Sequence, residues 1–72
     1  MKLPTYPNLR AELARFNITI SALADALGIS RQALTEKLAK RANFTLADII
    51  KIADFLNEKA GGGLTLDYLF RD

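Results

Sequence analysis

Apolar residues recur at intervals of three and four positions along the chain, and no stretch alternates between apolar and polar positions for long enough to predict a strand. This pattern predicts five helices, over residues 8–16, 20–27, 31–40, 46–58 and 66–70. The fourth has the broadest apolar face, which comprises Ile49, Ile50, Ile52, Ala53 and Leu56. Because 72 residues leave room for one domain only, we expect a single compact all-α domain over residues 1–72.

Four of these helices begin with the same short pattern. A Ser or Thr is preceded by an apolar residue and is followed, four positions later, by another. The hydroxyl can accept a hydrogen bond from a free N–H of the first turn, and the two apolar residues can pack together across it. The four sets are Ile18, Thr19 and Leu23; Ile29, Ser30 and Leu34; Phe44, Thr45 and Ile49; and Leu64, Thr65 and Leu69. Asp48, three residues after Thr45, nearly completes a capping box.

The second and third helices are joined only by Gly28, Ile29 and Ser30. Gly28 can take the positive φ that a sharp turn requires, and a turn this short forces the two helices to cross steeply. Ala24 is the small residue that such a close crossing needs. Elsewhere, Asn17 suits a left-handed residue after the first helix, and Gly61–Gly63 predict a flexible connector before the last one.

The positive charge is concentrated in one segment. Residues 31–41 hold four basic residues and one acidic residue, a net charge of +3, whereas the rest of the chain holds six basic and seven acidic residues, a net charge of −1. A solvated helix face would explain this distribution, and so would a surface that binds phosphates.

The amino-acid composition excludes several kinds of functional site. The chain has no cysteine and no histidine, which excludes disulfides, thiolate or histidine metal sites and nucleophile–histidine pairs. No acid–base pair is apparent either, so we expect no enzymatic activity, no cofactor and no small-molecule substrate. No apolar run is long enough to span a membrane, and no signal peptide is visible, so we expect a cytoplasmic protein.

The run LADALGISRQALTEKL, from Leu23 to Leu38, resembles the Cro and repressor family of phage and bacterial DNA-binding domains. The resemblance extends over about Leu9 to Phe70, and the run LTEKLAKRANFTLADIIKIADFL looks most like a branch of small prophage regulators. It implies a lambda repressor-like fold with the helix-turn-helix formed by the second and third helices. Three features depart from the family pattern: Ile20 replaces a common Gln, Lys40 replaces a Glu-x-Gly turn, and the stretch from Glu58 to Gly63 is longer than usual.

This resemblance implies that the third helix enters the major groove of double-stranded DNA with its first turn leading. Arg31 would bind guanine and Gln32 adenine, while Glu36 would accept from cytosine. The residues expected to read bases are Arg31, Gln32, Ala33, Thr35 and Glu36. Those expected to contact phosphates are Thr19, Ile20, Ser30, Lys37, Lys40, Arg41 and Asn43. Lys37 lies near the buried stripe, and its stem could instead lie along the fourth helix.

A single recognition helix reads few bases, so a homodimer on two half-sites is expected. The apolar residues that the core can best spare for its interface are Phe55, Leu64, Leu66, Tyr68, Leu69 and Phe70. We therefore expect a Cro-like repressor of prophage origin that acts in the bacterial nucleoid. The alternative is a protein-binding module on the same fold, whose partner is a phage repressor or a toxin.

Overall fold

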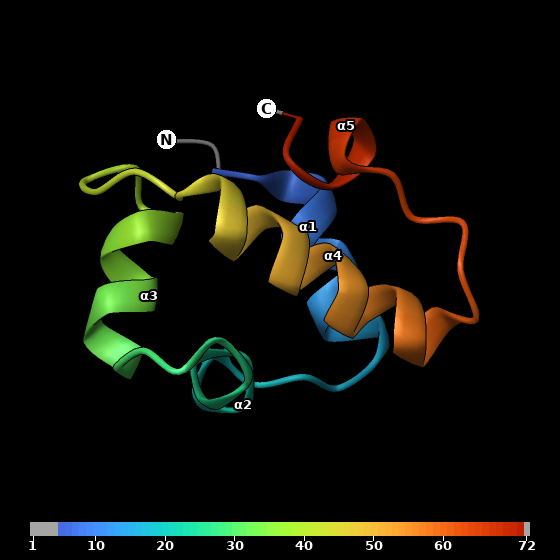
Figure 1. Ribbon diagram of the computed structural model, residues 1–72, viewed down its shortest axis with the longest axis horizontal. Helices are drawn as coiled ribbons and strands as arrows, with labels where there is room; N and C mark the ends of the chain where they lie inside the picture. The colour runs from blue at the N-terminus through green and yellow to red at the C-terminus, as the bar shows by residue number, and fades with distance from the viewer. Residues whose placement is uncertain (1–4, 72) are drawn as a thin grey trace.

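The computed structural model describes residues 5–71, which form five helices and no strand. These are α1 (Pro7–Arg15), α2 (Ile20–Leu27), α3 (Arg31–Leu38), α4 (Leu46–Ala60) and α5 (Leu66–Leu69) (Figure 1). The all-α prediction is confirmed. The expected boundaries differ by one or two residues at several ends, and the largest corrections are that α3 ends at Leu38 rather than Lys40 and that α4 continues to Ala60.

All four predicted helix starts are confirmed. The hydroxyl of each capping residue accepts a hydrogen bond from the backbone N–H three residues later, at 3.0–3.1 Å, and the capping residues are Thr19, Ser30, Thr45 and Thr65. Asp48 completes the capping box, because its carboxylate accepts a bond of 3.1 Å from the N–H of Thr45.

Four helices end in the same way. A residue in the left-handed conformation follows each helix, and the next N–H bonds to a carbonyl five residues earlier, which satisfies one of the helix's free carbonyls. The left-handed residues are Asn17, Gly28, Lys40 and Gly61, with φ of 55°, 73°, 62° and 80°. Asn17 and Gly28 were expected here from the sequence. Lys40 was not, and its left-handed backbone is the reason that α3 stops two residues early.

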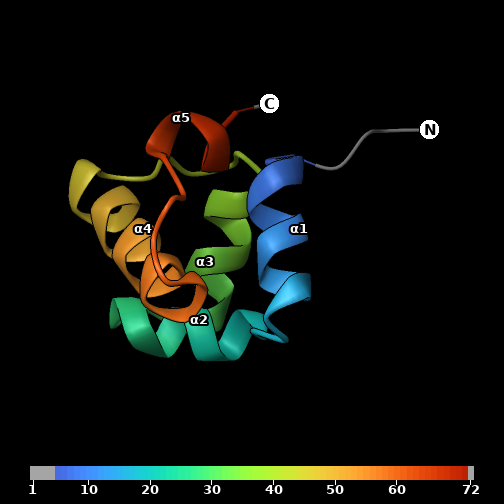
Figure 2. The same ribbon diagram turned by 90° about the vertical axis from the view of Figure 1, so that its right-hand side faces the viewer.

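The core lies where the five helices meet, and α2 crosses beneath the other helices (Figure 2). The buried apolar residues are Leu9, Leu13, Leu23, Ala24, Leu27, Leu34, Leu38, Ile52, Ala53, Leu56 and Leu69. Ile50 was expected in the apolar face of α4, but it is 45% exposed. The cause is helical phase, because Ile50 lies one turn after Leu46 on the side of α4 that turns away from Ile52 and Leu56.

The short helix α5 is held to the domain by polar contacts. The Asn8 side chain donates to the carbonyl of Tyr68 at 2.8 Å, and the Tyr68 hydroxyl donates to the buried carboxylate of Glu12 at 2.9 Å. The triglycine connector that precedes α5 is bridged by Asn57, whose amide both accepts from and donates to the backbone of Leu64, at 2.8 and 2.9 Å. These bonds fix both ends of the α4–α5 connection.

Candidate nucleic-acid interface

The turn between α2 and α3 builds the predicted motif. Figure 1 shows α2 nearly end-on and α3 from the side, so the two helices cross steeply. Ala24 is 2% exposed, which allows the helices to approach closely, and half-buried Ile29 packs against the core from the turn itself. Within the described part of the chain, no other helix covers the outer side of α3 (Figure 1).

The side chains of α3 divide into a buried and an exposed face. Leu34 and Leu38 are 0% and 2% exposed and lock the helix onto the core. Arg31, Gln32 and Thr35 are exposed on the other side, whereas Ala33 and Glu36 are half-buried. The first turn of α3 therefore offers a guanidinium and an amide to solvent from a helix whose position is fixed.

Two polar side chains of α3, those of exposed Thr35 and half-buried Glu36, already have partners. The Thr35 hydroxyl donates to the carbonyl of Arg31 at 2.9 Å, so its methyl group is the part left for apolar contact. The Glu36 carboxylate lies 3.5 Å from the guanidinium of Arg41. This ion pair offsets the negative charge that Glu36 would otherwise bring to an anionic ligand.

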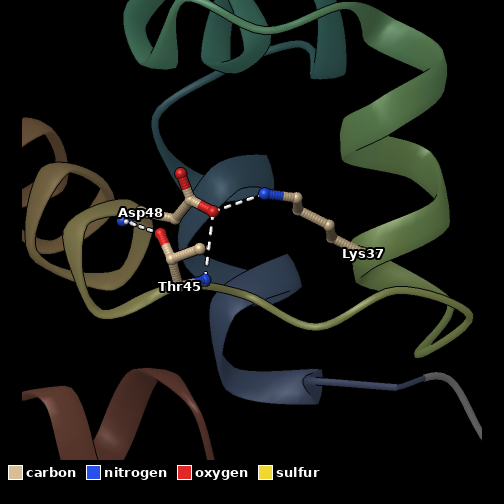
Figure 3. Close-up of polar contacts among 3 residues, drawn as sticks. All are labelled: Lys37, Thr45 and Asp48. Atoms are coloured by element: carbon tan, nitrogen blue, oxygen red, sulfur yellow. Dashed lines mark hydrogen bonds and ion pairs between the residues drawn. The ribbon is translucent and has the colours of Figure 1, made fainter.

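Lys37 lies in an ion pair inside the domain. Its ammonium donates to the carboxylate of Asp48, and the two side chains are only 17% and 11% exposed (Figure 3). The same carboxylate oxygen accepts from the N–H of Thr45, so Asp48 joins α3 to the start of α4. The hydrogen bond from Lys37 holds the pKa of Asp48 below its ordinary value, and the bonds from Thr45 act in the same direction against the opposing effect of burial.

The comparisons with known proteins agree with this geometry. A family model described as helix-turn-helix matches residues 9–61, which include α2, the turn and α3. The chain belongs to the lambda repressor and Cro-like helix-turn-helix family. This is a family of DNA-binding transcriptional regulators. The searches of curated proteins and of solved structures found no match for the chain.

In this helix-turn-helix domain, most of the residues expected to contact phosphates lie at the surface. The exposed ones are Thr19, Ser30, Lys40, Arg41 and Asn43. Ile20 is half-buried and its side chain is apolar, so it can offer a phosphate only its backbone N–H, and Lys37 faces Asp48. The ammonium of Lys40 lies 5.1 Å from the ring centroid of Tyr6, which is a cation–π contact at the edge of this surface.

The apolar surface of the domain differs from the one expected for a dimer. Leu69 is fully buried, and four other expected interface residues are half-buried against the core: Phe55, Leu64, Tyr68 and Phe70. Only Leu66 is largely exposed, at 42%. Among residues 5–71 the most exposed large apolar side chains are instead Leu46, at 69%, and Ile50, at 45%. Their spacing of one turn, out of phase with Ile52 and Leu56, was the available signal in the sequence.

An aromatic cluster was also not predicted. The rings of Tyr6, Phe44 and Phe70 contact one another edge to face, with centroids 5.5–5.8 Å apart. It joins the segment before α1, the α3–α4 loop and the end of α5. Within residues 5–71 no helix is long and apolar enough to cross a membrane, and no group of acidic side chains there could hold a metal ion.

Proposed function

We propose that this protein is a sequence-specific transcriptional regulator, a Cro-like repressor of prophage origin, that places α3 in the major groove of DNA. The observation that carries the proposal is the exposed first turn of α3 on a helix anchored by fully buried Leu34. A reading helix needs both features, because base contacts require side chains that are accessible and a backbone that does not move.

Each exposed residue of α3 has a base edge that suits its chemistry. Arg31 can donate two hydrogen bonds to O6 and N7 of guanine, and Gln32 can pair with N6 and N7 of adenine. Because the Thr35 hydroxyl is bonded to the carbonyl of Arg31, its methyl group is left to make an apolar contact with the methyl group of thymine. Ala33 can contribute to the same contact, whereas Glu36 reads cytosine only if its ion pair with Arg41 opens.

Phosphate contacts would come from groups on both sides of the turn. The first N–H groups of α2, at Ile20 and beyond, would point at one backbone strand of the DNA, and Ser30, between the helices, would add its hydroxyl. Lys40, Arg41 and Asn43 form the second set, in the α3–α4 loop. Lys37 is held in its internal pair, so the cations of this loop, Lys40 and Arg41, would supply the phosphate contacts, Arg41 by exchanging Glu36 for a phosphate, which predicts a modest salt dependence.

A second copy of the chain would bind through the exposed apolar residues of α4 and α5. Ile50, one turn after Leu46 on α4, has exposed charges of both signs next to it in the helix, Lys51 and Asp54, and Leu66 is an exposed apolar side chain on α5. Such a mixture of apolar and charged side chains can pair with itself about a two-fold axis. Three partly exposed aliphatic side chains fall short of the about 800 Å² that each partner contributes to a stable interface. The dimer would therefore be weak in solution and would form mainly on two adjacent half-sites.

The decisive experiment is selection of bound duplexes from a random DNA library at near-physiological salt. We expect enrichment of a palindrome with half-sites about one helical turn apart. If the library yields no enriched sequence, the proposal fails and the alternative becomes the stronger one. In that case the apolar pair on α4 would be a contact for a phage repressor or toxin.

A pair of variants then tests the reading helix. Arg31→Ala with Gln32→Ala should lower affinity for the selected site by about 10- to 100-fold while the thermal unfolding midpoint stays close to that of the wild type. Lys59→Ala is the matched control, because it removes one exposed cation at the C-terminal end of α4, away from α3 and from the proposed dimer contact. Equal losses in both variants would show that charge alone, and not base reading, explains the binding.

A further inference from the structure

The end of α3 that lies farther from the turn is held by a residue that precedes α1. The hydroxyl of Thr5 donates to the carbonyl of Leu38, the last residue of α3. The last carbonyls of a helix have no partner within it, so this bond satisfies one of them. Thr5 and Leu38 are 33 positions apart in the chain, and the contact therefore depends on the tertiary fold.

Thr5 is in turn fixed to α1 by Arg10. The guanidinium Nε donates to the Thr5 carbonyl at 2.6 Å, and Nη2 donates to the Thr5 hydroxyl at 3.2 Å. The hydroxyl thus accepts from Arg10 and donates to Leu38. Through this chain of bonds, α1 sets the position of the end of α3.

The next residue reinforces the same contact. Tyr6 has a left-handed backbone, with φ of 49°, and its ring packs on Phe44 and Phe70 from the cluster described above. The ammonium of Lys40 lies 5.1 Å from the centroid of the same ring. The segment Thr5–Tyr6 therefore touches both the last residue of α3 and the loop that carries Lys40, Arg41 and Asn43.

We infer that Thr5 is a positioning residue for DNA recognition, a role that rests on the proposed function. The short turn fixes the start of α3 relative to α2, and Thr5 fixes its end. If the end shifts, α3 tilts about the turn, which changes the angle at which Arg31, Gln32 and Thr35 would meet the bases relative to phosphates bound at the N-terminus of α2. Paired hydrogen bonds to base edges need closely defined geometry, whereas contacts to phosphates tolerate movement. Loss of the Thr5 hydroxyl should therefore weaken specific binding more than non-specific binding.

The first test compares Thr5→Val, which removes the hydroxyl and keeps the shape, with Thr5→Ser, which keeps the hydroxyl. Affinity is measured over a salt series for the selected duplex and for a scrambled duplex of the same length. We expect Thr5→Val to bind the selected duplex about five-fold more weakly, the change that corresponds to one net hydrogen bond. Affinity for the scrambled duplex and the salt slope should not change, and Thr5→Ser should behave like the wild type. Equal loss on both duplexes, or no loss on either, would overturn the inference.

The second test approaches the same bonds from α1. Arg10→Met keeps an apolar stem and removes the donors to Thr5, so it should reproduce the loss seen in Thr5→Val. The double variant should be no weaker than either single variant, because the two residues act in one chain of contacts. A salt slope reduced by about 0.9 in Arg10→Met would mean that Arg10 itself contacts a phosphate, and the inference would be wrong.

A third measurement needs no DNA. In Thr5→Val, amide hydrogen exchange at Leu38, Ala39 and Lys40 should become faster, while exchange at Leu23 and Leu27 in α2 stays the same. A uniform increase across the domain, or no increase at all, would contradict a local positioning role. If wild-type protein selects no duplex, the proposed function fails on that result, and this exchange pattern still decides whether Thr5 holds the end of α3.

Discussion

The two ends of α3 are fixed by different means. At its start, three residues connect it to α2, and each has a local role: Gly28 is left-handed, Ile29 packs on the core, and Ser30 caps the helix at 3.0 Å. At its end, the loop of residues 39–45 contains no glycine, and Lys40 takes the left-handed position. Here the contacts come from elsewhere in the chain, from Thr5 before α1 and from Asp48 in α4.

The start of α3 is therefore determined by local sequence, and its end is determined by tertiary contacts. The start of α3 is encoded in consecutive residues whose conformational preferences agree with the fold. The end of α3 adopts a backbone that a lysine disfavours, and it is stable because contacts from two distant segments converge on it. The start should therefore be sensitive to changes in the turn itself, and the end should be sensitive to changes far from it.

The largest loss of stability is expected from breaking the ion pair between Lys37 and Asp48 at the end of α3. Asp48→Asn leaves the ammonium of Lys37 half-buried without its counter-charge, and the free energy of unfolding should fall by about 3 kcal/mol. The Asn side chain can still accept from the N–H of Thr45, so the cap itself is retained. Urea denaturation gives the measurement.

The control for this variant is the double variant Lys37→Met with Asp48→Asn. Removing both charges leaves no uncompensated ion, so it should recover most of the lost stability. If the single variant is as stable as the wild type, or the double variant recovers nothing, the pair does not hold the end of α3.

A smaller loss is expected at the start of α3. Gly28→Ala should destabilise the domain by about 1 kcal/mol, because φ of 73° disfavours a side chain. A Cβ at this position would meet no atom within 4 Å, so backbone conformation is the sole cause. Thermal unfolding measures the change. Gly28→Asn tolerates the left-handed region better and should lose less, and a larger loss for Asn than for Ala would refute the conformational explanation.

The start of α3 could be predicted from the sequence, and its end could not. Residue type and spacing suffice to predict the roles of Gly28, Ser30 and Leu34. They also predict the caps at Thr19, Thr45 and Thr65. The bond from Thr5 to Leu38 joins residues 33 positions apart, and neither has a pattern that marks it. The left-handed backbone of Lys40 likewise follows from its neighbours in space, since lysine has no preference for it.

The candidate site shows the same division. Helical phase predicts Gln32 on the outward side of the helix and Leu34 on the inward side, as found, but it also places Glu36 outward, and this residue is half-buried. The ion-pair partners of the charged residues could not be predicted without the fold, because more than one cation lies close enough in the sequence to pair with Asp48 or with Glu36. For Lys37, the sequence allowed either a phosphate contact or a position along the fourth helix, and the structure gives it Asp48 as a partner. Which bases α3 reads depends on DNA geometry, which the sequence of the protein does not contain.

Two substitutions at Lys40 should separate backbone strain from side-chain contacts. Lys40→Gly relieves a left-handed conformation worth about 1 kcal/mol that Lys40→Ala retains, and both lose the same side-chain contacts, so Lys40→Gly should be more stable than Lys40→Ala by about 1 kcal/mol. Lys40→Ala is the control, because it removes the same charge and contact but keeps the strain, and it should be less stable than the wild type. If both variants change stability alike, strain at position 40 is not the cause.

The smallest effect is a difference in acid sensitivity between the two ends of α3. The hydrogen bond from Lys37 lowers the pKa of Asp48 in the folded protein, so the pair stabilises the fold fully above the ordinary pKa of 3.8. That stability is lost as the pH falls through the lowered pKa of the folded protein, because the unfolded chain takes up the proton more readily.

The turn at the start of α3 comprises Gly28, Ile29 and Ser30, none of which titrates in this range. The free energy of unfolding of the wild type should therefore fall more steeply below about pH 4 than that of Asp48→Asn, whose other carboxylates are unchanged. Parallel curves for the two proteins would mean that Asp48 is not the group through which acid loosens the end of α3.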